Sequence, residues 1–180
     1  MATIPTFETE RLFLKPISLN DVAAYEKGFV DYEVIRHLAA HVPWPYPADG
    51  VQDFIENYLL PRQGKSNWCW GIFLKPDQKE LIGSIEIRLS KTDNRGFWLA
   101  KKHWGKGYMS EAAGPIMAYA FEELSFEKMI FTNAKGNQRS RRIKEKTGAK
   151  CIGVKPAKFT DPQYTDSEIW ELTKEQWSLS

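Results

Sequence analysis

The sequence predicts an α/β (α+β) protein built around a mixed sheet. Three observations favour this class: an early strand is followed by helical segments, two strands joined by a tight turn come next, and the second half alternates strand, helix, strand and helix. A chain of 180 residues can bury a core of its own, and no repeat or linker divides it. We therefore expect one domain spanning residues 1–180.

The composition excludes several classes of protein. Hydrophobic residues make up 42% and charged residues 27% of the chain, which is ordinary for a soluble domain, and the net charge of +2 does not by itself predict nucleic-acid binding. No apolar run is long enough for a signal peptide or a membrane span, so we expect no membrane partner. Cys69 and Cys151 lack metal-ligand spacing and are typical of a reducing compartment, so we expect a cytoplasmic protein without a metal.

The beginning of the chain predicts one strand followed by helices. Residues 7–16 form an expected strand that a proline ends. Ser18, with Asp21 three residues later, can cap a helix that runs to about Val30. A short helical turn is expected at 31–38.

A proline-rich loop follows at residues 41–47. Three prolines in this segment exclude a helix or a central strand, so we expect a stiff loop that presents the side chains of Trp44 and Tyr46. A second helix is expected at 49–60, where Pro61 stops it.

Three strands are expected in the middle of the chain. Residues 68–74 and 81–89 predict two strands joined by a turn, and 96–99 predicts a short strand after a polar connection. Because side chains alternate along a strand, Glu86 and Arg88 share one face of the second strand.

The next helix is the most regular in the chain. From Met109 onward the apolar side chains fall at the i, i+3, i+4, i+7 spacing of a helix with one buried face. They are Ala112, Ala113, Ile116, Met117, Ala120, Phe121 and Leu124. Gly105 and Gly107 precede this helix, and glycine lets a loop approach a ligand closely. The free N–H groups of the first helical turn, with the helix dipole, predict an anion site here.

Two common phosphate loops do not match this segment. The dinucleotide fingerprint requires a third glycine where Ser110 stands, and the P-loop requires an earlier glycine where Ala100 stands. Residues 102–107 instead resemble the pyrophosphate loop of the GNAT acetyltransferase superfamily, Gln/Arg-x-x-Gly-x-Gly/Ala, although Lys102 departs from the first position. A plain strand-to-helix turn is the alternative interpretation.

A second GNAT signature lies beyond a short apolar strand expected at 129–132. There Asn137 can cap a helix that Gly148 ends. The segment resembles Asn-x-x-Ser-x-x-(apolar)-x-Glu-Lys-x-Gly-(apolar), with Ala149 in place of the usual final Phe. The matching positions are Asn137, Ser140, Ile143, Glu145, Lys146 and Gly148. Two signatures in this order are far more specific than either alone, and the resemblance to GNAT enzymes covers essentially the whole chain.

The opening of the chain narrows the resemblance. Residues 9–12, Thr-Glu-Arg-Leu, followed by an Asp-led helix, resemble the start of the RimJ/RimL-like branch. That branch acetylates protein N-termini, although many relatives take other amines. The resemblance implies the GNAT acyl-CoA N-acyltransferase fold, with a mixed, mostly antiparallel twisted sheet, helices on both faces and a cleft between two splayed strands.

The resemblance also implies acetyl-coenzyme A as co-substrate. The amides of residues 105–110 would hold the pyrophosphate, and Lys106 could add a charge. Unpaired backbone groups near residues 98–100 would pair with the pantetheine and stabilise an oxyanion. The implied coenzyme-binding residues are Trp98, Leu99, Ala100, Lys102, Gly105, Lys106, Gly107, Tyr108, Met109, Ser110, Asn137 and Ser140.

Ser140 and Glu86 are the candidate catalytic residues. Ser140 lies three residues after Asn137, so its hydroxyl could protonate the leaving thiolate. Many GNAT enzymes use a tyrosine further along the helix, but none occurs between Tyr119 and Tyr164. Many relatives carry a base glutamate before the Gly-aromatic pair; this chain lacks it, so Glu86 is the substitute. The alternatives are a structural Ser140, a Glu86 paired with a cation on a solvent face, and a water chain as base.

The acceptor amine is not defined by the sequence and belongs either to a protein N-terminus or to a small molecule. Its pocket could be lined by Trp44, Tyr46, Trp68 and Trp70, which could equally be core residues. A catalytically weak coenzyme-A-binding protein is one alternative, and an RNA-contacting module with a basic helix at 139–146 is another. We expect no nucleic acid except through a ribosomal-protein substrate, and either a monomer or a homodimer.

Overall fold

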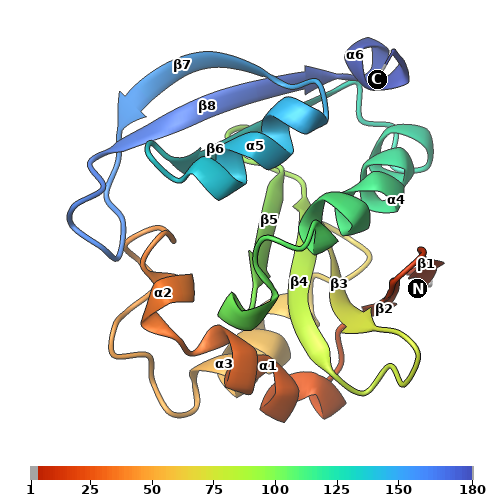
Figure 1. The fold of residues 1–180 in the computed structure, drawn as a ribbon, viewed down its shortest axis with the longest axis vertical. Helices are drawn as coiled ribbons and strands as arrows, with labels where there is room; N and C mark the ends of the chain where they lie inside the picture. The colour runs from red at the N-terminus through yellow and green to blue at the C-terminus, as the bar shows by residue number, and fades with distance from the viewer. Residues whose placement is uncertain (1–3, 180) are drawn as a thin grey trace.

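The computed structural model describes residues 4–179 and contains two antiparallel sheets (Figure 1). The larger sheet has the strand order β1-β2-β3-β4-β5. Its strands are β1 (Phe7–Glu8), β2 (Leu12–Pro16), β3 (Asn67–Leu74), β4 (Leu81–Arg88) and β5 (Arg95–Leu99). The smaller sheet has the order β6-β8-β7. Its strands are β6 (Lys128–Ala134), β7 (Lys150–Pro156) and β8 (Asp166–Thr173).

Helices pack against both faces of the larger sheet. On one side lie α1 (Val22–Phe29), α2 (Tyr32–Ile35) and α3 (Gly50–Asp53), which continues as a π-helix over Phe54–Leu59. On the other side lies α4 (Tyr108–Glu122). The next helix, α5 (Gln138–Lys146), lies between α4 and the smaller sheet, and α6 (Lys174–Ser178) follows β8 (Figure 1). No helix among residues 4–179 is long and apolar enough to cross a membrane.

Two apolar clusters explain this arrangement. The first cluster lies between α4 and the sheet, where Phe121 of α4 and Trp70 of β3 are fully buried. The second lies on the α1 side and includes Ile55 and Trp98. Neighbouring residues of β3 belong to different clusters, since side chains alternate along a strand: Cys69 faces α1 and Trp70 faces α4. The predicted α/β class, with helices on both faces of the sheet, is confirmed.

The two sheets meet at one point, and β5 and β6 then part (Figure 1). The N–H of Asn94 donates to the carbonyl of Ile130 at 2.7 Å, and the N–H of Ile130 donates to Oδ1 of Asn94 at 2.7 Å. Within the described residues no backbone hydrogen bond joins β5 to β6 beyond this point. The strand that ends at Leu99 and the helix that begins at Tyr108 were both expected from the sequence.

The structure corrects the expected first strand and adds elements after Ala149. Residues 7–16 form two antiparallel strands, because Thr9 closes a turn: its N–H donates to the carbonyl of Leu12 at 3.0 Å. No element was expected from the sequence after Ala149, where β7, β8 and α6 are found. Nearly all side chains of β7 are exposed and β8 buries Glu168, so neither strand shows a clean apolar alternation.

Candidate active site

The glycine loop before α4 leaves a row of backbone donors free. Gly105 has φ +74° and Gly107, the residue that caps α4, has φ +80°, a region that favours glycine. Among residues 4–179, no acceptor takes the N–H groups of residues 105–110. The space beside Gly105 is open, because a Cβ placed there would meet no atom within 4 Å. An oxyanion such as a phosphate could therefore approach these donors and the positive end of the helix dipole.

A clamp from the N-terminal segment holds this loop. The carboxylate of Glu111 accepts hydrogen bonds from the Thr9 hydroxyl at 2.6 Å, from the Arg11 N–H at 2.8 Å and from Arg11 Nε at 2.7 Å. Arg11 also donates to the carbonyl of Lys106 at 3.0 Å, and its guanidinium lies 4.5 Å from the ring centre of Tyr108. The Thr-Glu-Arg-Leu resemblance thus has a structural basis that sequence reasoning missed, since these contacts span about 100 residues.

We expect Glu111→Gln to destabilise the fold in a pH-dependent way. Burial alone would raise the pKa of Glu111, but hydrogen bonds from Thr9 and Arg11 outweigh it, so this pKa is lowered from 4.5. The stabilisation is therefore present above pH 4.5 and is lost as the pH falls through the folded-state pKa. Because Arg11 is partly exposed, we expect a loss of only about 1 kcal/mol at neutral pH.

Urea unfolding at neutral pH and at about pH 3.5 measures this difference. Glu122→Gln, on the exposed end of α4, is the control and should change neither value. A deficit of Glu111→Gln that does not shrink in acid would mean that the carboxylate charge has no part in the clamp.

The free edge of β5 faces the place where β6 departs. The N–H of Ala100 donates to β4 at 2.8 Å, and Trp98 lies opposite a β4 residue in the same ladder. Since alternate residues of an antiparallel strand point their backbone groups in opposite directions, we infer that those of Phe97 and Leu99 point away from β4. The carbonyl of Leu99 accepts from Trp104 Nε1 at 2.7 Å. Among residues 4–179, the N–H groups of Phe97 and Leu99 and the Phe97 carbonyl have no hydrogen-bond partner and are left for a ligand.

The two loop lysines differ in availability. Lys102, whose position departs from the family pattern, forms an ion pair with Glu80, and His103 Nε2 lies 3.4 Å from the same carboxylate. The side chain of Lys106 is exposed and has no partner among residues 4–179. Lys106 therefore offers an unengaged charge beside the glycine loop.

The start of α5 brings together Asn137 and Ser140. Asn137 caps the helix, because its Oδ1 accepts from the N–H of Ser140 at 3.4 Å, and Gly148 ends the helix region at φ +84°. The amide nitrogen of Asn137 has no acceptor within the described part of the chain. The hydroxyl of Ser140 is nearly buried and accepts a hydrogen bond from Lys144 Nζ at 2.8 Å. Sequence reasoning placed Lys144 on a basic surface, and that was wrong because this side chain is only 1% exposed.

The basic residues of α5 do not form a continuous cationic face. Arg139 lies 3.5 Å from the ring centre of Trp104, and Arg141 donates to the buried carboxylate of Glu168 at 2.8 Å. Lys144 points into the protein. Three of the five cations on this helix are thus engaged, which weakens the RNA-contact alternative.

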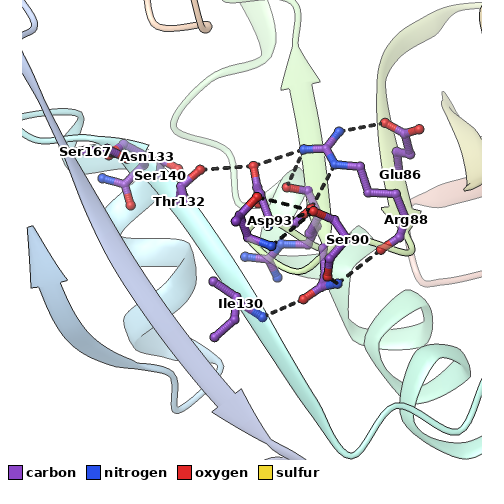
Figure 2. A network of polar contacts seen from close by, with 12 residues as sticks. Glu86, Arg88, Ser90, Asp93, Ile130, Thr132, Asn133, Ser140 and Ser167 are labelled. Atoms are coloured by element: carbon purple, nitrogen blue, oxygen red, sulfur yellow. Dashed lines mark hydrogen bonds and ion pairs between the residues drawn. The ribbon is translucent and has the colours of Figure 1, made fainter. Parts of the chain in front are cut away.

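Glu86 belongs to a polar network that joins the two sheets (Figure 2). Arg88 donates to Glu86 at 3.1 Å and to Asp93 at 3.0 Å, and Asp93 accepts from the Thr132 hydroxyl at 3.0 Å. Asn67 donates to the other oxygen of Glu86. The ion pair with Arg88 was one of the expected alternatives, but Glu86 is 9% exposed and does not lie on a solvent face.

The structure separates the four candidate acceptor-site aromatics. Trp44 is 43% exposed, and Tyr46 packs against Phe29 with ring centres 5.4 Å apart, both on the α1 side. Trp68 and Trp70 are buried in the cluster beneath α4 on the opposite face of the sheet. Only the first two side chains therefore reach the surface in this conformation.

A hollow of about 590 Å³ lies beside the start of α5, and no motif in the sequence predicts it. Ala40, Lys158, Phe159 and Tyr164 contribute to its walls. Tyr164 also lies against Gly136, in the turn that leads into α5. The hollow is thus close to the Asn137–Ser140 end of the site.

A comparison with protein families identifies the family to which this chain and its site belong. The family model described as an acetyltransferase (GNAT) domain matches residues 11–150, which include the glycine loop and α5. The chain belongs to the GNAT acetyltransferase family. The predicted family, fold and enzyme class, an N-acetyltransferase, are therefore confirmed.

Similar proteins agree with this assignment. The GNAT chain is 28% identical to the uncharacterized N-acetyltransferase YoaA of Bacillus subtilis (strain 168), over 94% of its own length and 97% of the relative. It is 31% identical to the putative ribosomal N-acetyltransferase YdaF of the same organism, over 54% of this chain and 56% of YdaF. A solved structure of RimL, a ribosomal L7/L12 alpha-N-protein acetyltransferase in complex with coenzyme A, matches with a TM-score of 0.78 at 16% identity, covering 94% of this chain and 97% of RimL. The match to YdaF supports the predicted RimJ/RimL-like branch, and the match to RimL shows a shared fold.

Proposed function

We propose that this GNAT protein transfers an acetyl group from acetyl-coenzyme A to a primary amine by direct attack in a ternary complex. The observation that carries the proposal is the run of free N–H groups at residues 105–110, next to the free backbone edge of β5. A ligand with a diphosphate and an amide-containing arm needs both features: the free N–H groups can bind the diphosphate, and the free backbone edge can pair with the amides of the arm. The residues present therefore fit acetyl-coenzyme A, which supplies an activated thioester carbonyl.

The coenzyme contacts follow from the chemistry of each group. The amides of residues 105–110 and the Lys106 ammonium would hold the diphosphate. The open backbone groups of Phe97 and Leu99 would pair with the pantetheine amides, and one N–H there would stabilise the developing oxyanion. The free amide nitrogen of Asn137 would donate to the same arm.

Ser140 and Glu86 are assigned as acid and base from their positions in the fold. Ser140 would protonate the leaving sulfur from the first turn of α5, and Glu86 would accept a proton from the attacking amine through water. An α-amine has a pKa of about 7.7–8.0, so part of it is already neutral at pH 7, whereas a lysine side chain at about 10.4 is not. An α-amine therefore needs less help from a base.

The names of the similar proteins favour two different kinds of acceptor amine. YdaF and RimL are named for ribosomal protein substrates, which favours a protein N-terminus. A relative from Aspergillus fumigatus, 26% identical over 96% of this chain and 78% of its own length, is named as an FsC-acetyl coenzyme A-N(2)-transacetylase, which favours a small amine. We propose that either acceptor enters past Trp44 and Tyr46 or through the hollow at Tyr164.

The test is a screen of N-terminal peptides and small amines for thiol release that depends on both acetyl-coenzyme A and the amine. We expect thiol release with at least one α-amine and an acetylated product that mass spectrometry detects. Calorimetric binding of coenzyme A without turnover on any amine would instead support the weak coenzyme-A-binding alternative.

Replacing Glu86 with glutamine tests the proposed base. Glutamine keeps the size of this buried side chain and one of the two hydrogen bonds that Glu86 accepts from Asn67 and Arg88. It cannot accept a proton, so kcat/KM at neutral pH should fall about fivefold. The remaining rise of kcat/KM with pH should then follow the amine alone, near its pKa of about 7.7–8.0. The comparison requires pH–rate profiles with one accepted amine. Glu122→Gln is the control, and a wild-type profile for Glu86→Gln would assign Glu86 to the scaffold.

A further inference from the structure

Lys144 is a buried cation with little to balance it. Its side chain is 1% exposed, and its one hydrogen bond within the described residues goes to Ser140 Oγ at 2.8 Å. No carboxylate of residues 4–179 lies within ion-pair distance of its ammonium. A buried ammonium without a counter-ion is costly, so such a lysine is a candidate functional residue.

The groups around Lys144 come from three neighbouring elements. Arg95 of β5 is also buried and repels the ammonium, while Asp93, just before β5, and Glu168 of β8 attract it more weakly. The ring centre of Phe97 lies 5.5 Å from Nζ. Burial, followed by repulsion from Arg95, lowers the pKa of Lys144 well below 10.5, and burial lowers the pKa of Arg95 itself to about 10. Lys144 therefore releases its proton more readily than an exposed lysine.

The direction of the hydrogen bond between Lys144 and Ser140 determines where the Ser140 hydroxyl hydrogen can point. Residues at i and i+4 lie on the same helix face, and here the lysine donates while the serine oxygen accepts. Ser140 lies in the first turn of α5, and no acceptor for its hydroxyl hydrogen is found among the described residues. The Ser140 hydroxyl hydrogen is thus left free to point toward a ligand.

We propose that Lys144 is a positioning residue that orients the Ser140 hydroxyl toward the leaving sulfur and resupplies its proton. The proposal rests on the proposed acetyl transfer. When the C–S bond breaks, its electron pair moves to sulfur, the sulfur takes the Ser140 proton, and Ser140 Oγ takes a proton from the Lys144 ammonium. The amine nitrogen gives up its extra proton to water, and Lys144 regains one from solvent, so protons balance over the turnover.

The test is Lys144→Met, which keeps the volume and removes both charge and donor. We expect kcat to fall about fivefold, with coenzyme A affinity by calorimetry within about twofold of wild type, because the thioester and not the binding loop is affected. Protonated Lys144 is the active form, so wild-type kcat should decline as the pH rises through its lowered pKa, and the variant should lack this decline. Lys144→Gln, which keeps a donor without the charge, should give an intermediate kcat.

Two controls separate this proposal from a structural role. Lys146→Met removes an exposed lysine of the same helix and should leave kcat and its pH profile unchanged. Ser140→Ala combined with Lys144→Met should be no slower than Ser140→Ala alone, because Lys144 acts through Ser140. Additive losses would contradict the proposal.

A binding-independent readout is NMR of protein labelled at the lysine Cε. One resonance, absent from Lys144→Met, should titrate well below the others and shift when Ser140 is replaced by alanine. A Lys144 resonance that titrates with the exposed lysines, or a Lys144→Met enzyme with wild-type kcat and pH profile, would overturn the proposal. Failure of wild-type protein to bind coenzyme A or release thiol would overturn the proposed function instead.

Discussion

Replacing Gly107 with aspartate should weaken coenzyme A binding at least tenfold, which corresponds to about 1.4 kcal/mol. Gly107 caps α4 at φ +80°, and its neighbours offer free N–H groups where a diphosphate must approach. A carboxylate there would repel the phosphates and would lie near Arg11, whose Nη2 is 3.5 Å from the position of the new Cβ. Aspartate is a good helix cap, so the fold should be retained.

The matched control is Gly107→Asn, which has nearly the same shape but no charge. Asparagine and aspartate both tolerate the left-handed conformation, so the difference between the two variants isolates the charge. Calorimetric titration with coenzyme A measures both affinities, and the melting temperature checks the fold. Unchanged affinity in a folded Gly107→Asp protein would remove the loop from the site.

Much of the fold could be predicted because local chemistry fixes local structure. The helix that begins at Tyr108 has a continuous apolar face. In α5, Asn137 caps the first turn and Gly148 follows the last turn with a positive φ, as residues at helix ends often do. The glycine loop was found for the same reason, since positive φ at Gly105 and Gly107 requires glycine. These features depend on neighbours within a few residues.

The missed features depend on contacts between distant segments or on burial. The clamp on Glu111 joins residues about 100 positions apart, and no spacing in the sequence announces it. Lys144 fits a basic stripe by residue type, and only the packing of α5 against β5 and β8 shows that it is buried. Trp70 likewise could be core or pocket until its face of β3 was known.

Replacing Ser140 with alanine should lower kcat by about tenfold to 100-fold while leaving coenzyme A affinity nearly unchanged. General acid–base groups contribute about 10²–10⁴-fold, and a thiolate is a good leaving group, so we expect the low end or below. The hydroxyl lies on the first turn of α5 and is oriented by Lys144 at 2.8 Å. An interaction made mainly in the transition state lowers kcat without weakening ground-state binding.

Because alanine also deprives buried Lys144 of its hydrogen-bond partner, stability must be measured beside the kinetics. Ser167→Ala is a suitable control: it removes another buried hydroxyl, on β8, that donates to the Asn133 carbonyl at 3.4 Å and has no hydrogen bond to Ser140 or Lys144 among the described residues. We expect both variants to lose stability, Ser140→Ala the more because a buried ammonium loses its partner, but we expect a loss of kcat only in Ser140→Ala. If folded Ser140→Ala turns over at the wild-type rate, the thiolate leaves without a protein acid, and positioning and exclusion of water by the cleft carry the catalysis.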